Sequence, residues 1–442
     1  MKPKPTLGSI ESRMAFTAAS ISSSVYQAPS WGSPFQATAG LPRLKSSLLR
    51  SGAIIARLQT SVLMRIRAEG LACKPRASLA FGSIPGYHRG APFAKEIPMR
   101  RVAAMDGRGQ FAVIEEAIPD PKPGQVLIEV AASLVSPGTE LGGVPARRKN
   151  PTDSPPRPFG YQNAGTILRL GEGVTRFRVG DRVATMGGGY ALHASHTVAP
   201  VNLTVPVPEG VSFEEAAFCH LAATALHCLR RAEPQFGENF AVSGLGLVGL
   251  LCAQFARLCG THVVGLDRFP KRLELAKATG ADAAFNVAEA DPVPRVREFC
   301  RGHGLDCGII AFGGEATEAA KQLYEMMRPA PDGHRWGRLV AVGGARVTLG
   351  LAADLGNVDI RSSARPGPGY HDDAWEHGAD YPPVFVPWTT QRNLEESLRA
   401  IAEGALRVKP LITDIVPLAH APAACEKLVT APGEAIGVIL KP

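Results

Sequence analysis

The segment from Phe240 to Asp267, FAVSGLGLVGLLCAQFARLCGTHVVGLD, decides the fold of this chain. Gly244, Gly246 and Gly249 form the pattern G-x-G-x-x-G between a short apolar strand and a helix, and a second apolar strand follows. The first glycine lets the chain turn, and the second lets the backbone approach a pyrophosphate. The third lets the helix pack on the strand. The segment therefore predicts a strand–helix–strand unit of a nucleotide-binding sheet.

The same segment predicts a bound dinucleotide. Glycine turns of this kind also occur without a ligand, but here strands expected at 240–242 and 262–266 flank the helix. The helix N-terminus offers free amides and a positive dipole end to the phosphates. Asp267 ends the second strand, where a carboxylate accepts hydrogen bonds from the ribose hydroxyls and repels the extra phosphate of NADP, which favours NAD. Arg268 would accommodate that phosphate if Asp267 turned away, so NADP stays open. The predicted cofactor-binding residues are Gly244, Gly246, Leu247, Val248, Gly249, Asp267, Arg268, Gly313 and Gly343.

Length and composition narrow the class of protein. A chain of 442 residues suggests two or three domains, and 45% apolar residues fit a globular protein. No stretch is apolar for long enough to span a membrane. The eight cysteines are scattered without a C-x-x-C pair, which argues against a disulfide framework and against a cysteine-cluster zinc site. We expect a protein of a reducing compartment, the cytoplasm, with no membrane partner.

The charge distribution argues against nucleic-acid binding. The net charge is +8, but residues 1–98 hold 13 Lys and Arg against 3 Glu, and the remainder holds 35 basic against 37 acidic residues. The remainder therefore has no basic footprint for nucleic acid. Residues 1–98 are rich in Ser, Ala and Arg and contain no Asp, a composition shared by organelle transit segments and disordered tails. We expect a dispensable or non-native extension, with organelle import as the alternative, so a chain that begins at Met99 should fold and bind cofactor.

The rest of the chain divides into three parts. Residues 99–210 read as short strands between Pro/Gly turns, which indicates a small β-rich domain. Residues 211–361 begin with a helix capped by Ser212 and then alternate strands and helices, which indicates a doubly wound parallel sheet. Residues 362–442 return to short strands around one helix and should rejoin the first domain. The predicted fold class is α/β, with a dinucleotide-binding domain inserted into a β-rich domain.

From Met99 to Pro442 the chain resembles the medium-chain alcohol dehydrogenase-like oxidoreductases. The resemblance rests on Gly180-Asp181-Arg182-Val183, on the turn GLGLVG with Asp267, and on the ending PLITDIVPLAHAPAACEKLVTAPGEAIGVILKP. It implies a GroES-like catalytic domain around an inserted Rossmann domain, and a homodimer or homotetramer. The stretches SPGTE (136–140) and GPGYHDD…GADYPPVFVPWTTQRN (367–393) resemble a bacterial branch that acts on sugar-like or bacteriochlorophyllide-like hydroxyl groups.

The residues that would hold the family's catalytic zinc are replaced. Zinc-binding members carry a Cys in a C-G-[ST]-D turn and a His in a G-H-E-x-x-G turn, where this chain has Pro137 and Tyr161. The third ligand position falls near Cys219 and His220. Proline cannot ligate, neutral tyrosine is a poor zinc ligand, and one remaining ligand does not hold an ion that normally takes three protein groups. We therefore predict no metal site, catalytic or structural.

By the resemblance, Thr139, Glu140, Tyr161, Gln162 and His220 should line the substrate site. Tyr161, assisted by Thr139, would handle the proton or stabilise an oxyanion during hydride transfer. The alternative is structural: Thr139 and Glu140 cap a turn and Tyr161 fills the volume of the missing metal. The catalytic residues that we predict are Tyr161, Thr139, Glu140 and His220, while His193 and His196 are expected in surface or structural roles.

These observations leave three functions open. The first is a zinc-independent NAD(P)-linked oxidoreductase acting on a hydroxyl or carbonyl group of a polar, sugar-like small molecule. The second is a quinone or enone reductase, and the third is a dinucleotide-binding sensor that has lost its chemistry. Tyr370, His371, Asp372, Asp380, Tyr381, Trp388 and Arg392 form a polar, aromatic segment that would either bind substrate or pack a domain or subunit contact.

Overall fold

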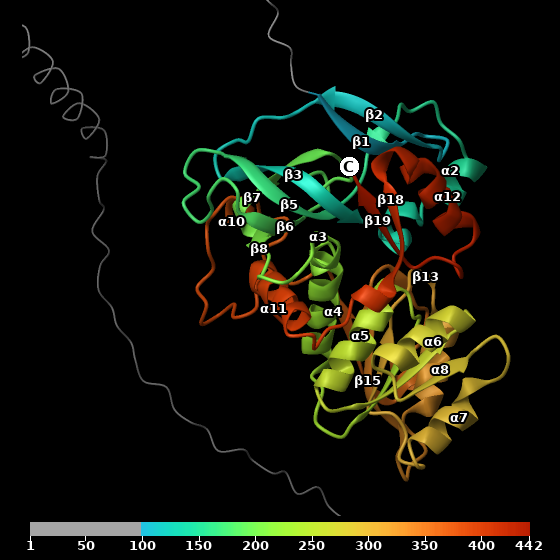
Figure 1. Ribbon diagram of the computed structural model, residues 1–442. Helices are drawn as coiled ribbons and strands as arrows, with labels where there is room; N and C mark the ends of the chain where they lie inside the picture. Colours follow the sequence, from blue (N-terminus) through green and yellow to red (C-terminus); the bar gives the residue numbers. More distant parts are fainter. Residues whose placement is uncertain (1–98) are drawn as a thin grey trace, which may run out of the picture. The chain divides into compact units, whose positions relative to one another are not determined.

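The computed structural model describes residues 99–442, and the predictions made for residues 1–98 lie outside the described residues. The described part belongs to one compact unit, Gly90–Pro442. Within this unit a β-rich part is built from both ends of the described chain, and an α/β part lies between them in sequence (Figure 1). The predicted fold class is confirmed.

The α/β part contains a seven-stranded sheet in the order β11-β10-β9-β12-β15-β14, with β17 also paired to β15. All neighbours are parallel except β14, which runs antiparallel to β15. Strand β9 is buried along its whole length, as expected for a parallel strand covered on both faces. The strands are β9 (Asn239–Ser243), β10 (His262–Asp267), β11 (Ala283–Asn286), β12 (Cys307–Ile310), β14 (Arg328–Pro329), β15 (Arg335–Val342) and β17 (Asn357–Ser363).

Helices connect these strands in the alternation that the sequence predicts. They are α5 (Leu247–Leu258), α6 (Pro270–Thr279), α7 (Pro292–Phe299), α8 (Thr317–Met326) and α9 (Leu351–Leu355). Helix α5 is apolar nearly throughout, because it packs against β9 and β10 on one side and against α4 on another. A short parallel pair, β13 (Gly314–Glu315) with β16 (Ala345–Arg346), links the segments that follow β12 and β15.

The β-rich part contains a second seven-stranded sheet, in the order β18-β19-β3-β5-β6-β8, with β7 also paired to β3. The last strand, β19, pairs antiparallel with β3, so the predicted return of the C-terminal segment to the first domain is confirmed. A smaller sheet has the order β2-β1-β4. The strands are β1 (Met99–Met105), β2 (Phe111–Ala117), β3 (Gln125–Leu134), β4 (Arg157–Pro158), β5 (Gln162–Leu170), β6 (Arg182–Met186), β7 (His196–Pro200), β8 (Thr204–Pro206), β18 (Ile412–Pro417) and β19 (Gly437–Lys441).

The predicted helix after Ser212 is two helices, α3 (Phe213–Ala216) and α4 (Cys219–Ala232). The predicted cap is confirmed, since Ser212 and Glu215 form a reciprocal capping box. The single continuous helix is wrong, because a turn at Ala217 and Phe218 interrupts it, and the Phe218 side chain is fully buried in the main core. Helix α4 packs against α5 and against α11 (Thr390–Ala402), so one apolar core joins the two parts.

The remaining helical segments lie in the β-rich part and around the late polar segment. They are η1 (Pro137–Leu141), α2 (Val144–Lys149), η2 (Val201–Leu203), α10 (Asp373–Glu376), η3 (Lys409–Leu411), η4 (Leu418–His420) and α12 (Ala421–Thr430). Between residues 99 and 442 no helix combines the length and the apolar composition that crossing a bilayer requires.

Candidate active site

The glycine turn has the geometry that a dinucleotide site needs. Gly244 has φ of 91°, a left-handed conformation that favours glycine, and a Cβ on Gly249 would lie 1.8 Å from the carbonyl oxygen of Gly244. Helix α5 can therefore approach the turn only because residue 249 has no side chain. A Cβ on Gly246, the residue before α5, would meet nothing within 4 Å. Open space thus lies beside the second glycine, at the helix N-terminus where a pyrophosphate would bind.

Asp267 is buried and holds the turn together. Its Oδ2 accepts a hydrogen bond from the backbone N–H of Leu245 at 2.7 Å, and its Oδ1 accepts from the N–H of Phe269 at 2.9 Å. The guanidinium of Arg272 lies 3.6 Å from the same Oδ2. Each carboxylate oxygen has further lone pairs, which is what ribose hydroxyls would use. The structure therefore gives Asp267 a role in the turn that the sequence did not indicate, and its binding of ribose stays a prediction.

The basic residues after β10 gather around one aromatic ring. The guanidinium carbons of Arg268 and Arg272 lie 4.9 Å and 4.7 Å from the centre of the Phe269 ring. Arg272 also donates to the carbonyl oxygen of Pro432 at 2.7 Å, whereas Arg268 is exposed. Arg268 is thus the cation of this pair that has room to meet an additional phosphate on the ribose.

The structure brings the other predicted cofactor residues to the same edge of the sheet. Gly313 and Gly343 follow β12 and β15, and β12 pairs with both β9 and β15. The carboxyl ends of these three strands therefore meet beside Gly244. Leu247 is buried and Val248 is half-buried in the first turn of α5, so the predicted contact with a phosphate would fall to their backbone amides.

Tyr161 and His220, two of the predicted catalytic residues, are in contact and meet a third ring from the late polar segment. The ring centres of Tyr161 and His220 lie 4.7 Å apart in an edge-to-face arrangement. Tyr370 also lies edge-to-face with the imidazole, with 6.3 Å between the ring centres. We call these three residues the Tyr161 cluster. They come from the start of β5, the start of α4 and the segment before α10.

Burial keeps both groups of the central pair uncharged. Burial lowers the pKa of His220 to about 4, against which its hydrogen bond to the Tyr161 backbone works weakly. His220 Nδ1 lies 3.2 Å from that carbonyl oxygen, which can only accept, so Nδ1 carries the hydrogen and Nε2 keeps its lone pair. Burial also raises the pKa of the Tyr161 phenol, and the negative charge of Glu140 raises this pKa further. The hydroxyls of Ser136 and Thr139 lower this pKa, but by less. Near neutral pH, Tyr161 is a donor and His220 an acceptor.

Glu140 is directed into the protein. Its Oε2 accepts from the N–H of Ser136 at 2.7 Å and lies 3.2 Å from His193 Nε2. His193 Nδ1 lies 2.9 Å from the hydroxyl of Ser133, and the imidazole is fully buried. Glu140 therefore does cap its turn, as the structural alternative predicted, and its second oxygen is buried without a partner among the described residues.

The other predicted site residues, Thr139 and Gln162, have different surroundings in the structure. Thr139 is exposed and has its hydroxyl near Tyr161, as the proton-handling hypothesis requires. Gln162 is buried, and its amide donates to the carbonyl oxygen of Leu134 at 3.0 Å, so it fixes the start of β5. His193 is the residue whose connection to the site was missed. Its partner Glu140 lies 53 positions away, and no local pattern marks that pairing.

The donor set at the expected metal position does not fit zinc. Pro137 and Tyr161 stand where the family's cysteine and histidine would be, and the thiol of Cys219 points to the carbonyl oxygen of Leu394 at 3.5 Å. Within residues 99–442, no three His, Cys, Asp or Glu side chains come together in a way that could hold a metal ion. His220 alone is not sufficient for a site that needs three protein ligands.

The late polar segment is only partly directed toward the site. Tyr370 belongs to the Tyr161 cluster, whereas the hydroxyl of Tyr381 donates to Asp372 at 2.7 Å, and Asp372 caps α10. The Trp388 ring lies between the guanidinium groups of Arg230 and Arg392, at 3.2 Å and 3.8 Å from the ring centre. The segment therefore combines a packing function with one residue at the site.

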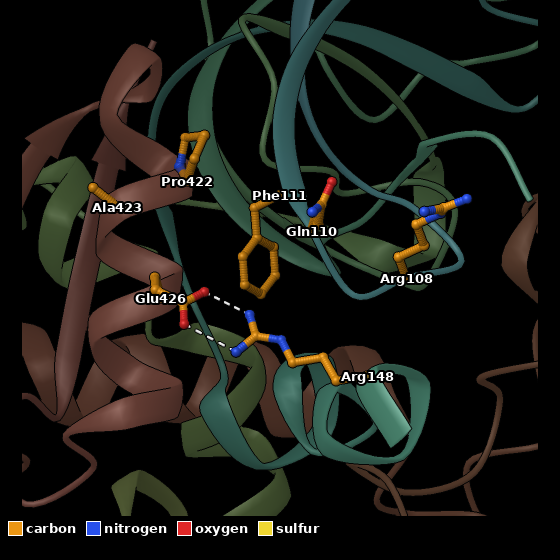
Figure 2. Close-up of a pocket in the computed structure, with 7 residues that line it drawn as sticks. All are labelled: Arg108, Gln110, Phe111, Arg148, Pro422, Ala423 and Glu426. Atoms are coloured by element: carbon orange, nitrogen blue, oxygen red, sulfur yellow. Dashed lines mark hydrogen bonds and ion pairs between the residues drawn. The ribbon is translucent and has the colours of Figure 1, made fainter. Parts of the chain in front are cut away.

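A separate hollow of about 480 Å³ lies between the β1–β2 turn, α2 and α12 (Figure 2). Arg148 forms two bonds to the carboxylate of Glu426 across it, of 2.9 Å and 2.5 Å, and joins α2 to α12. Because α2 follows η1 closely, this pair anchors the turn that carries Thr139. The charge of Arg148 is already neutralised by Glu426. None of the residues that line the hollow belongs to the Tyr161 cluster or to the glycine turn.

Comparisons with known proteins agree with this geometry. Residues 122–209 match the family model of the alcohol dehydrogenase GroES-like domain, and residues 248–379 match that of the zinc-binding dehydrogenases. A sorbitol dehydrogenase of Halalkalibacterium halodurans is 31% identical over 260 residues, which cover 51% of this chain and 73% of that protein.

Two solved structures share the fold and were determined with a dinucleotide. A putative zinc-binding dehydrogenase of Sinorhizobium meliloti 1021, bound to NADP, is 20% identical with a TM-score of 0.60, covering 78% of this chain and 100% of that one. A protein described as a short chain alcohol dehydrogenase of Escherichia coli CFT073, complexed with NADH, is 20% identical with a TM-score of 0.61, covering 78% and 99%.

Proposed function

The chain belongs to the zinc-containing alcohol dehydrogenase superfamily of medium-chain oxidoreductases, and on this premise we propose a reaction that does without zinc. The protein is an NAD(P)-dependent dehydrogenase that transfers hydride to or from a hydroxyl or carbonyl group of a polar small molecule. The contact between neutral Tyr161 and neutral His220, beside a metal position without metal ligands, is the observation that carries this proposal.

Tyr161 and His220 supply the groups that a reaction without zinc needs. A dinucleotide held at the glycine turn and Asp267 would supply or accept the hydride. Tyr161, held neutral by its burial, donates a hydrogen bond to the substrate carbonyl oxygen and gives up its proton as the oxygen gains charge. The hydroxyls of Ser136 and Thr139 stabilise the resulting phenolate. In the reverse direction, His220 Nε2 first orients the substrate hydroxyl by accepting its hydrogen bond. Tyr161, having lost its own proton to solvent, then takes the hydroxyl proton as the hydride leaves the carbon.

Asp267 favours NAD as the cofactor. Its carboxylate lies at the end of β10 with lone pairs left for ribose hydroxyls, and its charge disfavours a 2′-phosphate. Exposed Arg268 keeps NADP as the alternative cofactor. We also propose a polar, sugar-like substrate, a homodimer or homotetramer and a cytoplasmic location. Native mass measurement tests the oligomer, and a monomer would refute it.

A quinone or enone reductase is the second candidate, because Tyr161 with Ser136 and Thr139 would hold an enolate oxygen as well as an alkoxide. A dinucleotide-binding sensor without chemistry is the third, since an intact glycine turn accompanies replaced metal ligands. One screen separates the three functions: NADH and NADPH consumption against ketones, enones and quinones, with metal analysis of the same sample. Stoichiometric zinc that chelation removes together with activity would refute the zinc-free reaction. Binding of dinucleotide without turnover would favour the sensor.

The role of Tyr161 is tested by Tyr161→Phe. Loss of a group that donates to the developing oxyanion should lower kcat by about 100-fold, while the Kd for NADH stays unchanged. Tyr324→Phe, which changes a half-buried phenol on α8, is the matched control. Unchanged turnover in Tyr161→Phe would remove this residue from the mechanism.

A further inference from the structure

Within the Tyr161 cluster, Tyr370 is held in place by a hydrogen bond to a distant loop. Its phenol oxygen accepts the backbone N–H of Gly188 at 2.7 Å, and its ring is half-buried. The adjacent ring of His371 stacks on it with 3.9 Å between the ring centres. The late polar segment therefore contributes one aromatic residue that both a hydrogen bond and a stacked ring hold in place.

The backbone around Tyr370 is held in an uncommon conformation. Arg365 and His371, which stand on either side of it in sequence, have φ of 63° and 76°, a region that residues with a Cβ rarely adopt. Buried Glu376 accepts the N–H of His371 at 2.7 Å, and the carbonyl oxygen of Pro368 accepts the N–H of Thr390 at 2.7 Å. Strained residues persist only where the surroundings over-determine them, and they concentrate at functional sites.

The hydrogen of the Tyr370 hydroxyl is not used by the protein. A phenol oxygen can donate one hydrogen and accept others, and the N–H of Gly188 occupies an acceptor position. Within residues 99–442, no protein acceptor lies within hydrogen-bonding distance and geometry for the Tyr370 hydrogen. Tyr381, a phenol of the same segment, differs because it donates to Asp372. Tyr370 therefore keeps a donor beside His220, which Tyr161 also contacts.

We infer that Tyr370 is a specificity-determining residue that donates its hydroxyl hydrogen to a second oxygen of the substrate. This inference rests on the proposed function, in which Tyr161 and His220 hold the reacting oxygen. The second oxygen would lie on the carbon next to the reacting one, because both phenol rings contact the same imidazole, with ring-centre distances of 4.7 Å and 6.3 Å. The favoured substrate class is then a vicinal diol or its α-hydroxy carbonyl, in preference to a simple alcohol.

The first test uses two substrate pairs that differ by one hydroxyl: butane-2,3-diol against butan-2-ol with NAD, and acetoin against butan-2-one with NADH. Wild type should show higher kcat/KM for the member with two oxygens. Tyr370→Phe should lower kcat/KM for that member by about 10- to 100-fold and leave the other within about twofold. Tyr381→Phe, which removes a phenol already paired within the protein, should preserve the discrimination. Equal losses for both members of a pair, or no loss, would overturn the inference.

The second test does not require turnover. Ligand-observed NMR measures the binding of butane-2,3-diol to the NADH-loaded protein, and Tyr370→Phe should weaken it by at least about fivefold relative to wild type and Tyr381→Phe. If wild type turns over none of the four compounds but binds the diol through Tyr370, the proposed reaction fails and the inference on Tyr370 stands. Diol binding that is absent, or equally strong in Tyr370→Phe, would overturn the inference whatever the turnover.

Discussion

Substituting alanine for each of two glycines of the turn separates the packing role from the binding role. In Gly249→Ala the new Cβ would lie 1.8 Å from the carbonyl oxygen of Gly244, a backbone atom that cannot rotate away. Overpacking of this kind costs about 1–3 kcal/mol, and a backbone contact places it near the upper end. Alanine returns about 1 kcal/mol of helix propensity inside α5. We expect a net loss of about 2 kcal/mol in the free energy of unfolding.

Gly246→Ala should behave in the opposite way. Nothing lies within 4 Å of the added Cβ, and φ of −68° suits alanine, so the free energy of unfolding should change by less than about 0.5 kcal/mol. The Cβ would instead occupy the space beside the pyrophosphate. We expect the Kd for NADH to rise by about 10- to 100-fold.

Urea unfolding of the cofactor-free protein and titration of NADH fluorescence measure the two effects separately. A constant m-value between the variants and wild type is needed for the comparison, because it shows that the same surface unfolds. Unchanged NADH affinity in Gly246→Ala would refute the placement of the pyrophosphate. Wild-type stability in Gly249→Ala would refute the close approach of α5 to the turn.

Three further predictions concern charge. Because burial lowers the pKa of His220 to about 4, the unfolded state binds more protons between about pH 6.5 and 4, so acidification through this window should remove up to about 3 kcal/mol of stability. The urea midpoint of His220→Gln should fall less steeply than that of wild type, and parallel curves would contradict this assignment. His193→Phe removes the partner of the buried Glu140 carboxylate and should lower the free energy of unfolding by about 3 kcal/mol in urea unfolding. Ser133→Ala removes a neutral hydrogen bond and should lower it by about 1 kcal/mol, so similar losses would show that the Glu140–His193 pair stabilises no more than that bond. Asp267→Asn should weaken NADH more than NADPH in calorimetric titrations, and Arg268→Ala should weaken NADPH more than NADH, whereas equal shifts would show that neither residue selects the cofactor.

The parts of the site that could be predicted are those in which a short pattern fixes its own geometry. The three glycines and Asp267 lie within 24 residues, and their spacing requires the turn, the helix and the second strand that the structure shows. Tyr161 and His220 were predicted because, by the resemblance, each occupies a position of the family's pattern, and the structure places their rings in contact. The single helix after Ser212 was wrong, because the apolar pattern continues across the turn at Ala217 and Phe218, and no residue there marks the interruption.

The sequence by itself determined the alternation of strands and helices and the glycine turn, because each depends on residues close together in the chain. The tertiary structure decided how distant side chains combine. It directed Glu140 inward to His193, separated by 53 positions, and brought Tyr370 to His220 while leaving Tyr381 paired with Asp372. Such pairings depend on how sheets and loops pack, and no periodicity or spacing in one chain records the distance between segments that meet only after folding.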